Sequence, residues 1–177
     1  MAATVIINRL TGSGPTKTAI TNGNTRLSYS DAASPGTNDP VVVPTSGTNR
    51  SWWATTRLEC TAAPSNLINN IKWYSDGSSF GTGLTCVGNT STGYTQATGS
   101  GGAGTSGTTL NTTNYSTLAG APADVTTHTS GSPKSVSGST STAQEFGDRF
   151  VFQLEVTSTA SPGTTTARTF TWQFDET

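Results

Sequence analysis

Apolar and polar residues alternate most regularly near the C-terminus. Over residues 149–157, and again over 169–175, every second residue is a large apolar one, a period of two that is typical of half-buried β-strands. Between the two runs lies Ser161-Pro162-Gly163, which is a turn signal. The pattern predicts a closing β-hairpin over 148–177. Its inward side chains are Phe150, Phe152, Leu154, Val156, Phe170, Trp172 and Phe174.

A second alternating run, over residues 52–60, predicts a strand with one apolar face. That face carries Trp52, Ala54, Leu58 and Cys60. Trp53 falls on the opposite face, among polar and charged neighbours. We therefore assign Trp52 to the core and expect Trp53 at the surface.

Two shorter runs predict further strands. Residues 71–74 form an aromatic strand bounded by turn residues, and residues 84–87 form a weaker one. The alternation assigns Trp73 to the core and turns Tyr74 outward. Trp53 and Tyr74 are thus the aromatic residues expected to be free for contacts.

Three stretches outside these strands predict extended segments of a single domain that spans 1–177. Residues 1–10 contain the β-branched run Val5-Ile6-Ile7, which is able to pair with another strand as an N-terminal arm. Residues 31–48 carry three prolines, and residues 88–142 are rich in Gly, Thr and Ser. Loops longer than about 15 residues in a compact domain usually serve a function or a partner, or they contain strands that the pattern does not reveal. We expect these tracts to extend from the domain rather than to join its core.

The composition points away from nucleic-acid and membrane partners. The chain has 37 Thr and 22 Ser, together 59 of 177 residues, and only 11% charged residues with a net charge of −1. Hydroxyl side chains compete for backbone hydrogen bonds and so disfavour long helices. The cations are too scattered to form a phosphate-binding stripe. The start shows no signal-peptide pattern, and no apolar run is long enough to span a membrane, so we expect synthesis in the cytoplasm.

Side chains that commonly perform catalysis are scarce. The only histidine is His128, with Asp124 four residues before it, and the chain has no Gly-x-Ser-x-Gly motif. One histidine and two cysteines are one ligand short of a zinc site. The acidic residues are not spaced as in a calcium loop. We expect no enzyme activity, no metal and no cofactor, with His128 an ordinary loop residue and Asp76 part of a turn.

The two cysteines leave two interpretations open. Cys60 and Cys86 form a structural disulfide if their strands are neighbours. Otherwise they are two buried free thiols, the interpretation that synthesis in a reducing compartment favours.

The order of these features resembles an immunoglobulin-like β-sandwich. A strand ends in Cys60, Trp73 follows 13 residues later, and an aromatic run closes the chain. The resemblance is partial, because the penultimate strand has no cysteine and no tyrosine precedes it. A jelly-roll-like sandwich fits the same alternation. The sequence therefore predicts an all-β fold, an immunoglobulin-like or jelly-roll-like β-sandwich with long Gly/Thr/Ser-rich arms and loops.

The profile also resembles virion structural proteins of tailed bacteriophages, especially head decoration, or capsid cement, proteins. The residues that carry the resemblance are the run from Ala2 to Leu10 with its Gly-Ser-Gly-Pro stop, the run from Asn69 to Tyr74, and the run from Thr169 to Asp175. The resemblance implies a protein on the capsid exterior that binds the major capsid protein. It also implies a trimer or another symmetric homo-oligomer. The candidate interface residues are Val5, Ile6, Ile7, Trp53 and Tyr74.

Two alternatives stay open. One is another virion role, as a tail or fibre component or a capsid-forming subunit. The other is a non-catalytic carbohydrate-binding module, which requires an exposed, coplanar aromatic pair in a groove.

Overall fold

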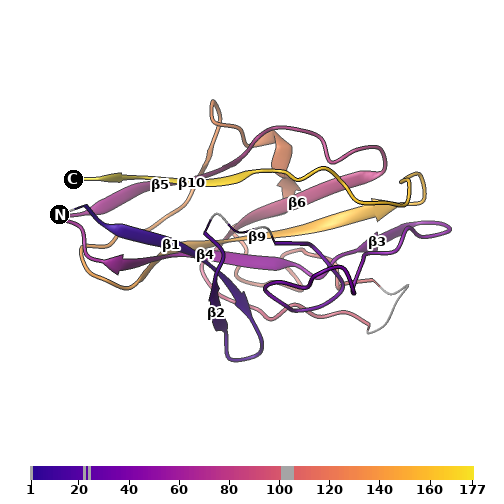
Figure 1. Ribbon diagram of the computed structural model, residues 1–177, viewed down its shortest axis with the longest axis horizontal. Coiled ribbons are helices and arrows are strands. Elements are labelled where there is room, and N and C mark those ends of the chain that lie inside the picture. The colour runs from indigo at the N-terminus through magenta and orange to yellow at the C-terminus, as the bar shows by residue number, and fades with distance from the viewer. Residues whose placement is uncertain (1, 22, 24, 101–105) are drawn as a thin grey trace.

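The computed structural model describes residues 2–21, 23, 25–100 and 106–177, which form two facing β-sheets (Figure 1). The larger sheet contains β1 (Thr4–Thr11), β2 (Thr16–Ala19), β3 (Thr48–Arg50), β4 (Ala54–Ala62), β6 (Leu84–Ser91), β7 (Ala123–Asp124) and β9 (Glu145–Thr157). The smaller sheet contains β5 (Ile68–Ser75), β8 (Lys134–Ser135) and β10 (Phe170–Glu176). One 3-10 turn, η1 (Val125–Thr127), precedes β8. The prediction of an all-β sandwich is confirmed.

Every strand pair is antiparallel, and β9 is the centre of the larger sheet. The order there is β2-β1-β4-β9-β6-β7, with β3 also paired to β9, and the smaller sheet has the order β10-β5-β8. The core lies between the sheets. Trp73 of β5 stacks on Phe150 of β9 with ring centroids 3.6 Å apart and an angle of 9° between the rings. This contact joins the two layers at their middle.

The predicted closing hairpin is wrong, because β9 and β10 do not pair. β9 pairs with β3, β4 and β6 in the larger sheet, whereas β10 pairs with β5 in the smaller one. The chain crosses between the layers over residues 158–169. Both strands carry bulky apolar side chains on one face, and a hairpin would have left that face without cover. Placed in opposite sheets, the two faces cover each other.

Residues 4–10 do pair, as their β-branched run predicts, but the expectation of an N-terminal arm is wrong. Residues 4–10 pair with β4 along almost the whole of β1, and residues 8–11 pair with β2 as well. The pairing places Val5 beside Cys60 and Ile7 beside Leu58, so both apolar side chains pack against the core. An alternating apolar strand is more stable in a sheet than free in water.

The described parts of 88–142, residues 88–100 and 106–142, pack on the domain, which corrects a third expectation. Part of this tract folds over the outer face of the larger sheet and builds a second core there. Its buried members are Trp53, Ala97, Leu110, Tyr115, Leu118 and Val151. Farther along the tract, Val125 and Val136 join the main core. The Gly, Thr and Ser residues therefore connect single apolar anchors, and part of the outer face of the larger sheet is covered as well.

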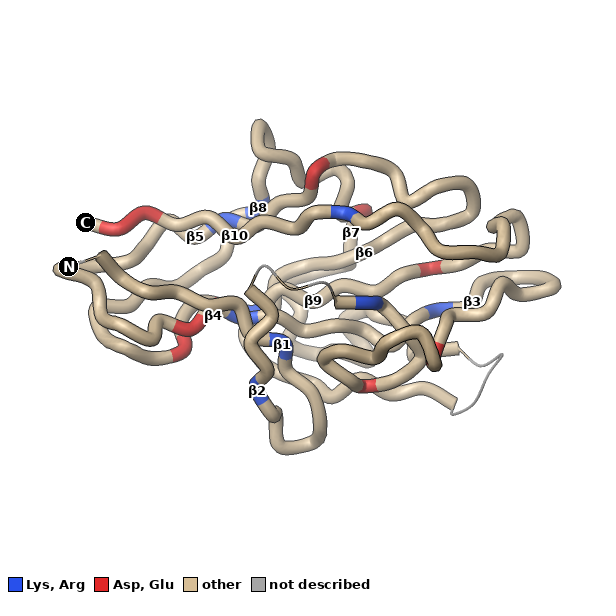
Figure 2. Tube along the Cα trace, in the orientation of Figure 1, with Lys and Arg blue, Asp and Glu red and all other residues tan. Residues whose placement is uncertain are grey.

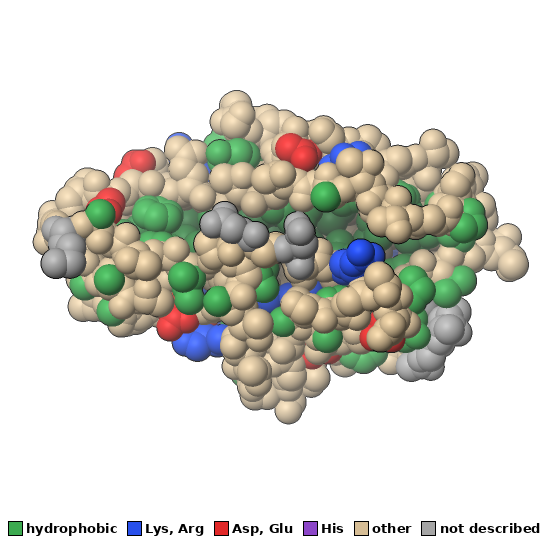
Figure 3. Space-filling view, viewed as in Figure 1, with side chains coloured by type: hydrophobic (Ala, Val, Ile, Leu, Met, Phe, Trp, Pro, Cys, Tyr) green, Lys and Arg blue, Asp and Glu red, His purple; other side chains and the backbone are tan. Residues whose placement is uncertain are grey.

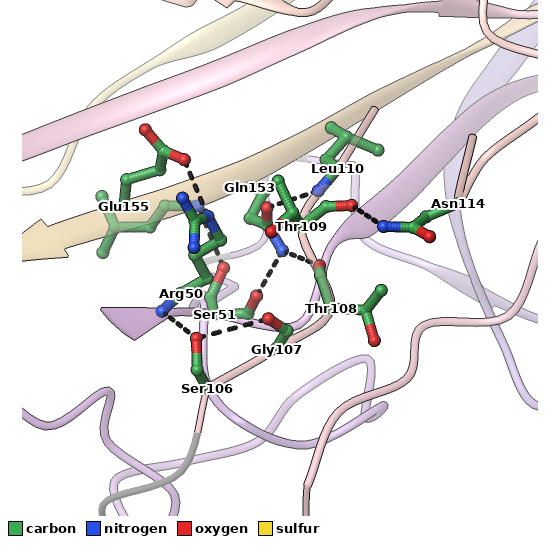
Figure 4. A network of polar contacts seen from close by, with 11 residues as sticks. Arg50, Ser51, Ser106, Gly107, Thr108, Thr109, Leu110, Asn114, Gln153 and Glu155 are labelled. Carbon is green, nitrogen blue, oxygen red and sulfur yellow. Dashed lines mark hydrogen bonds and ion pairs between the residues drawn. The ribbon is translucent and has the colours of Figure 1, made fainter. Parts of the chain in front are cut away.

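A buried amide fixes this cover to the sheet (Figure 4). Gln153 of β9 is fully buried, and its Oε1 accepts a hydrogen bond of 2.9 Å from the Leu110 N–H. Its Nε2 donates to the carbonyls of Ser51, at 2.7 Å, and Thr108, at 2.8 Å. One side chain thus satisfies three backbone groups that no strand ladder reaches.

Candidate interaction surface

An open groove, lined by apolar side chains and by threonines, runs between the two sheets where β1 faces β10. Its volume is about 290 Å³. Val5, Ile7 and Leu58 line it from the larger sheet, and Phe170, Trp172 and Phe174 line it from the smaller one. Figure 3 shows hydrophobic side chains along a hollow between the two layers. The groove is therefore the place where the sandwich is not closed.

The strand register explains why these side chains are only half-buried. Trp172 lies opposite Trp73, and Phe170 lies opposite Ser75, so both point toward the core. The Phe170 ring centroid is 5.0 Å from that of Trp73 and 5.0 Å from that of Phe152. β10 is nevertheless the last strand of its sheet, so one flank of these rings has no neighbouring strand. The apolar lining is continuous with the core and reaches solvent at the sheet edge.

The backbone of β10 also has a free side. The Thr169 carbonyl accepts from the Asp76 N–H, and Thr177 exchanges both backbone hydrogen bonds with Leu67, so odd-numbered residues face β5. Bonding direction alternates along a strand, and the N–H and C=O groups of Phe170, Trp172 and Phe174 therefore point away from β5. Within the described ranges, none of these groups receives or donates a hydrogen bond on that side.

The other strands at sheet edges are shorter or charged. β2 has four residues and carries Lys17, while β7 and β8 have two residues each. Short strands and lysines are the usual protection against edge-to-edge pairing. β10 has seven residues, and its stretch from Phe170 to Phe174 has no charge and no proline. β10 is therefore the sheet edge best suited to accept another strand.

The structure places the predicted interface residues in different surroundings. Val5 and Ile7 line the groove, whereas Ile6 lies beside Glu59 on the outer face of the larger sheet. Tyr74 is half-buried on the outer face of the smaller sheet, opposite Thr171. The groove and the outer face around Tyr74 are thus separate surfaces.

The prediction that Trp53 is exposed is wrong. Trp53 is 2% exposed and belongs to the second core, where its indole N–H donates to the Thr95 carbonyl at 3.0 Å. The predicted alternation is correct for Ala54, Leu58 and Cys60, but the outer face is covered by residues from 92–100 and 106–118. Trp52 is half-buried and packs against the second core instead of the main one. Trp53 precedes β4 and is buried in the second core, whereas Tyr74 lies on β5 in the smaller sheet, so the two form no common aromatic platform.

The cysteines are buried free thiols, and the disulfide alternative is wrong. β9 lies between the strands of the two cysteines, and the Cys60 backbone N–H donates to the carbonyl of Gln144, the residue before β9. Cys86 pairs with Leu154 near the other end of β9. Ten residues of strand separate those two positions, roughly 30 Å at about 3.3 Å per residue, far beyond the reach of a disulfide. Burial raises the pKa of both thiols.

The polar residues considered for chemistry have structural partners. Asp124 caps η1 by accepting from the Thr126 N–H, and Asp76 accepts from the Ser78 and Thr169 N–H groups. Burial and the nearby charge of Lys134 lower the pKa of His128. Among the described residues, no group of three His, Cys, Asp or Glu side chains is placed to hold a metal ion.

Neither a protein-family model, nor a curated protein, nor a solved structure matches the chain. In the part of the chain that the structure describes, no helix is long and apolar enough to cross a membrane.

Proposed function

We propose that the chain is a non-enzymatic structural protein of a tailed-bacteriophage virion, which decorates the capsid exterior and stabilises it through contacts between subunits. The observation that carries this proposal is the open groove beside the free edge of β10. A row of unpaired backbone groups next to apolar side chains fits an extended polypeptide, because the backbone supplies affinity and the side chains supply specificity. The site is therefore suited to assembly with other protein chains.

The character of the surface supports the same proposal. Charged residues are sparse and scattered over the fold (Figure 2), and the net charge is −1. Weak net charge limits repulsion when many copies crowd one surface. It also gives no attraction to nucleic acid or to anionic membranes, so the proposed partners are the major capsid protein and further copies of the chain.

In this proposal, assembly does not use the extended arms that the sequence predicts. Residues 4–10 pair within the larger sheet, and parts of the described stretch of 88–142 pack against the sandwich. The groove, the β10 edge and the outer face around Tyr74 take their place in the proposal. A sugar-binding module is not favoured, because Trp53 is buried and the expected aromatic pair is absent from the described surface.

Two measurements test the proposal. Cryo-electron microscopy of the virion should show density of this chain at repeated positions on the head lattice. Density on the tail, or in no particle, would contradict a decoration role. In co-sedimentation with capsids that lack the protein, Trp172→Lys in the groove should abolish binding. Thr164→Lys, which adds the same charge in the exposed loop before β10, should bind like the unchanged protein.

A further inference from the structure

We propose that β10 pairs with β10 of a second copy in antiparallel orientation, so that two smaller sheets join into one sheet of six strands around a two-fold axis. Each copy contributes the three strands β10, β5 and β8. The inference deepens the proposed function, since it names the chain that occupies the free edge. The dimer itself is argued from the β10 edge, and only its role in capsid decoration rests on the proposed function.

The backbone directions permit this pairing. The backbone N–H and C=O groups of Phe170, Trp172 and Phe174 point away from β5, and the same groups do so in a second copy. In an antiparallel pair, residues that point toward each other exchange hydrogen bonds. Pairing Trp172 with Trp172 of the partner subunit therefore also brings Phe170 opposite Phe174 of the partner subunit. Both copies use one patch, as a two-fold interface requires.

The charges at the ends of β10 select this register and this partner. Arg168 precedes the strand, and Asp175 and Glu176 end it (Figure 2). Centring the pair on Trp172 places Arg168 opposite Glu176 of the partner subunit, and the two-fold axis repeats this contact. A shift of two residues in either direction removes both contacts. Parallel pairing would put like charges side by side. The edge is thus complementary to itself only in the antiparallel arrangement.

Arg168 forms no ion pair with a carboxylate in the described structure, although Asp76 is near enough for their opposite charges to interact. Its guanidinium donates to the Ser79 carbonyl and to its own neighbour, the Ala167 carbonyl. Glu176 accepts from the Ala3 N–H at 2.8 Å, and one of its oxygens has no partner in the described residues. Both charged groups can therefore gain an opposite charge without losing an ion pair.

Pairing would also cover the apolar lining. The side chains of Phe170, Trp172 and Phe174 lie on the inner side of β10, and those of a second copy would follow them along the same side of the joined sheet. Tyr74 and Thr171 lie on the outer side. The dimer therefore presents two copies of the Tyr74 face on one continuous sheet, which doubles the surface available for a capsid contact.

Sedimentation equilibrium of the purified chain, without capsids, tests the inference. We expect a dimer whose dissociation constant rises by about tenfold or more in Arg168→Glu and in Glu176→Arg, because each variant replaces two attractions with two repulsions. The double variant restores opposite charges and should recover dimerisation. Lys134→Glu on β8, at the other edge of the smaller sheet, is the matched control and should dimerise normally. A monomer, a trimer, or single variants without effect would overturn the proposal.

A cross-linking experiment tests the register. In the register centred on Trp172, Thr171 faces Gln173 of the partner subunit as a pair without hydrogen bonds, with Cα atoms about 4.5 Å apart. Mixing Thr171→Cys chains with Gln173→Cys chains should therefore give a disulfide-linked dimer under mild oxidation. Neither variant alone should cross-link efficiently. Cross-linking of Gln173→Cys with itself would overturn this register. Dimerisation without capsid binding would contradict the proposed function alone, and capsid binding by a monomer would contradict the dimer alone.

Discussion

The side chain of Gln153 shows how one residue decides the placement of a long segment. It is fully buried within a β-sheet, a position where an unpaired amide would be costly. Its hydrogen bonds all go to backbone groups outside the neighbouring strands. One partner is Ser51, which lies between β3 and β4, and the other two are Thr108 and Leu110 in the covering segment. The amide therefore acts as a specific anchor where strand pairing is absent.

Replacing this amide should be expensive. Gln153→Ala leaves the Leu110 N–H and the Ser51 and Thr108 carbonyls buried without partners, and we expect a loss of about 3 kcal/mol in the free energy of unfolding. Chemical denaturation measures the loss. Gln173→Ala, the same change at an exposed position, should alter stability by less than about 0.5 kcal/mol. Equal effects at the two positions would contradict the anchoring role.

His128 should make stability depend on pH. Burial and Lys134 lower its pKa in the folded chain below the usual value of 6.5, so the unfolded chain binds more protons in that range. The stabilisation is therefore complete above about pH 6.5 and is lost as the pH falls through the folded pKa. Urea denaturation should show less loss of stability on acidification in His128→Gln. Proton NMR of the single imidazole measures the pKa directly, and a value above 6.5 would contradict the prediction.

Among the structural elements, the segment 106–118 depends on a close approach to the sheet. The Gly107 N–H donates to the Arg50 carbonyl at 2.8 Å, and a Cβ atom on Gly107 would lie 2.7 Å from the Ser51 carbonyl carbon. Because the Cβ would meet backbone atoms and not a flexible side chain, one of the two backbone segments would have to move. The absence of a side chain at this position is therefore a packing requirement.

We expect Gly107→Ala to destabilise the fold by about 1–3 kcal/mol, since the segment must shift away from Ser51. Gly14→Ala is the control, because a Cβ there meets no atom within 4 Å and the backbone is not in a left-handed conformation. Thermal unfolding compares the two variants. Hydrogen exchange at the Leu110 amide, which bonds Gln153, should be faster in Gly107→Ala. Unchanged exchange would show that the segment tolerates the side chain.

The sequence predicts several strands and the side of each that faces inward, but it does not predict which strands pair with one another. The period of two correctly locates β4, β5, β9 and β10 and correctly turns Trp73 inward. It does not tell whether two strands with matching apolar faces pair side by side or face each other across a core. β9 and β10 face each other, and that single difference turned the expected hairpin into the two layers of a sandwich.

The second core was missed for a different reason. Its cover comes from Ala97, Leu110, Tyr115 and Leu118, which are spaced too irregularly among Gly, Thr and Ser to show any period. The available signal was Tyr115 itself, an isolated large side chain that is fully buried. Without that cover, Trp53 would have been exposed as expected. The free edge of β10 likewise follows from strand order, which local patterns do not contain.

At the scale of the whole molecule, the fold keeps its two thiols apart and out of water. Cys60 and Cys86 are 1% and 0% exposed, and burial raises their pKa. We expect neither thiol to react with a thiol reagent at neutral pH under native conditions, and both to react in denaturant. The melting temperature should be unchanged by a reducing agent. Rapid modification of the native chain, or a stabilising disulfide, would contradict the arrangement of β4, β9 and β6.

The two ends of the described chain also share one pole of the molecule, where the Ala3 N–H bonds Glu176 (Figure 1). A tensile force applied at these two residues would peel β1 and β10 from their sheets, breaking backbone hydrogen bonds one after another. Peeling requires much less force than shearing a whole strand at once. In the proposed role, a shell under pressure would therefore load the molecule through its contact surfaces, which are the outer face around Tyr74 and the β10 edge. The pole where the ends meet is correspondingly free to carry an attached peptide without weakening the shell.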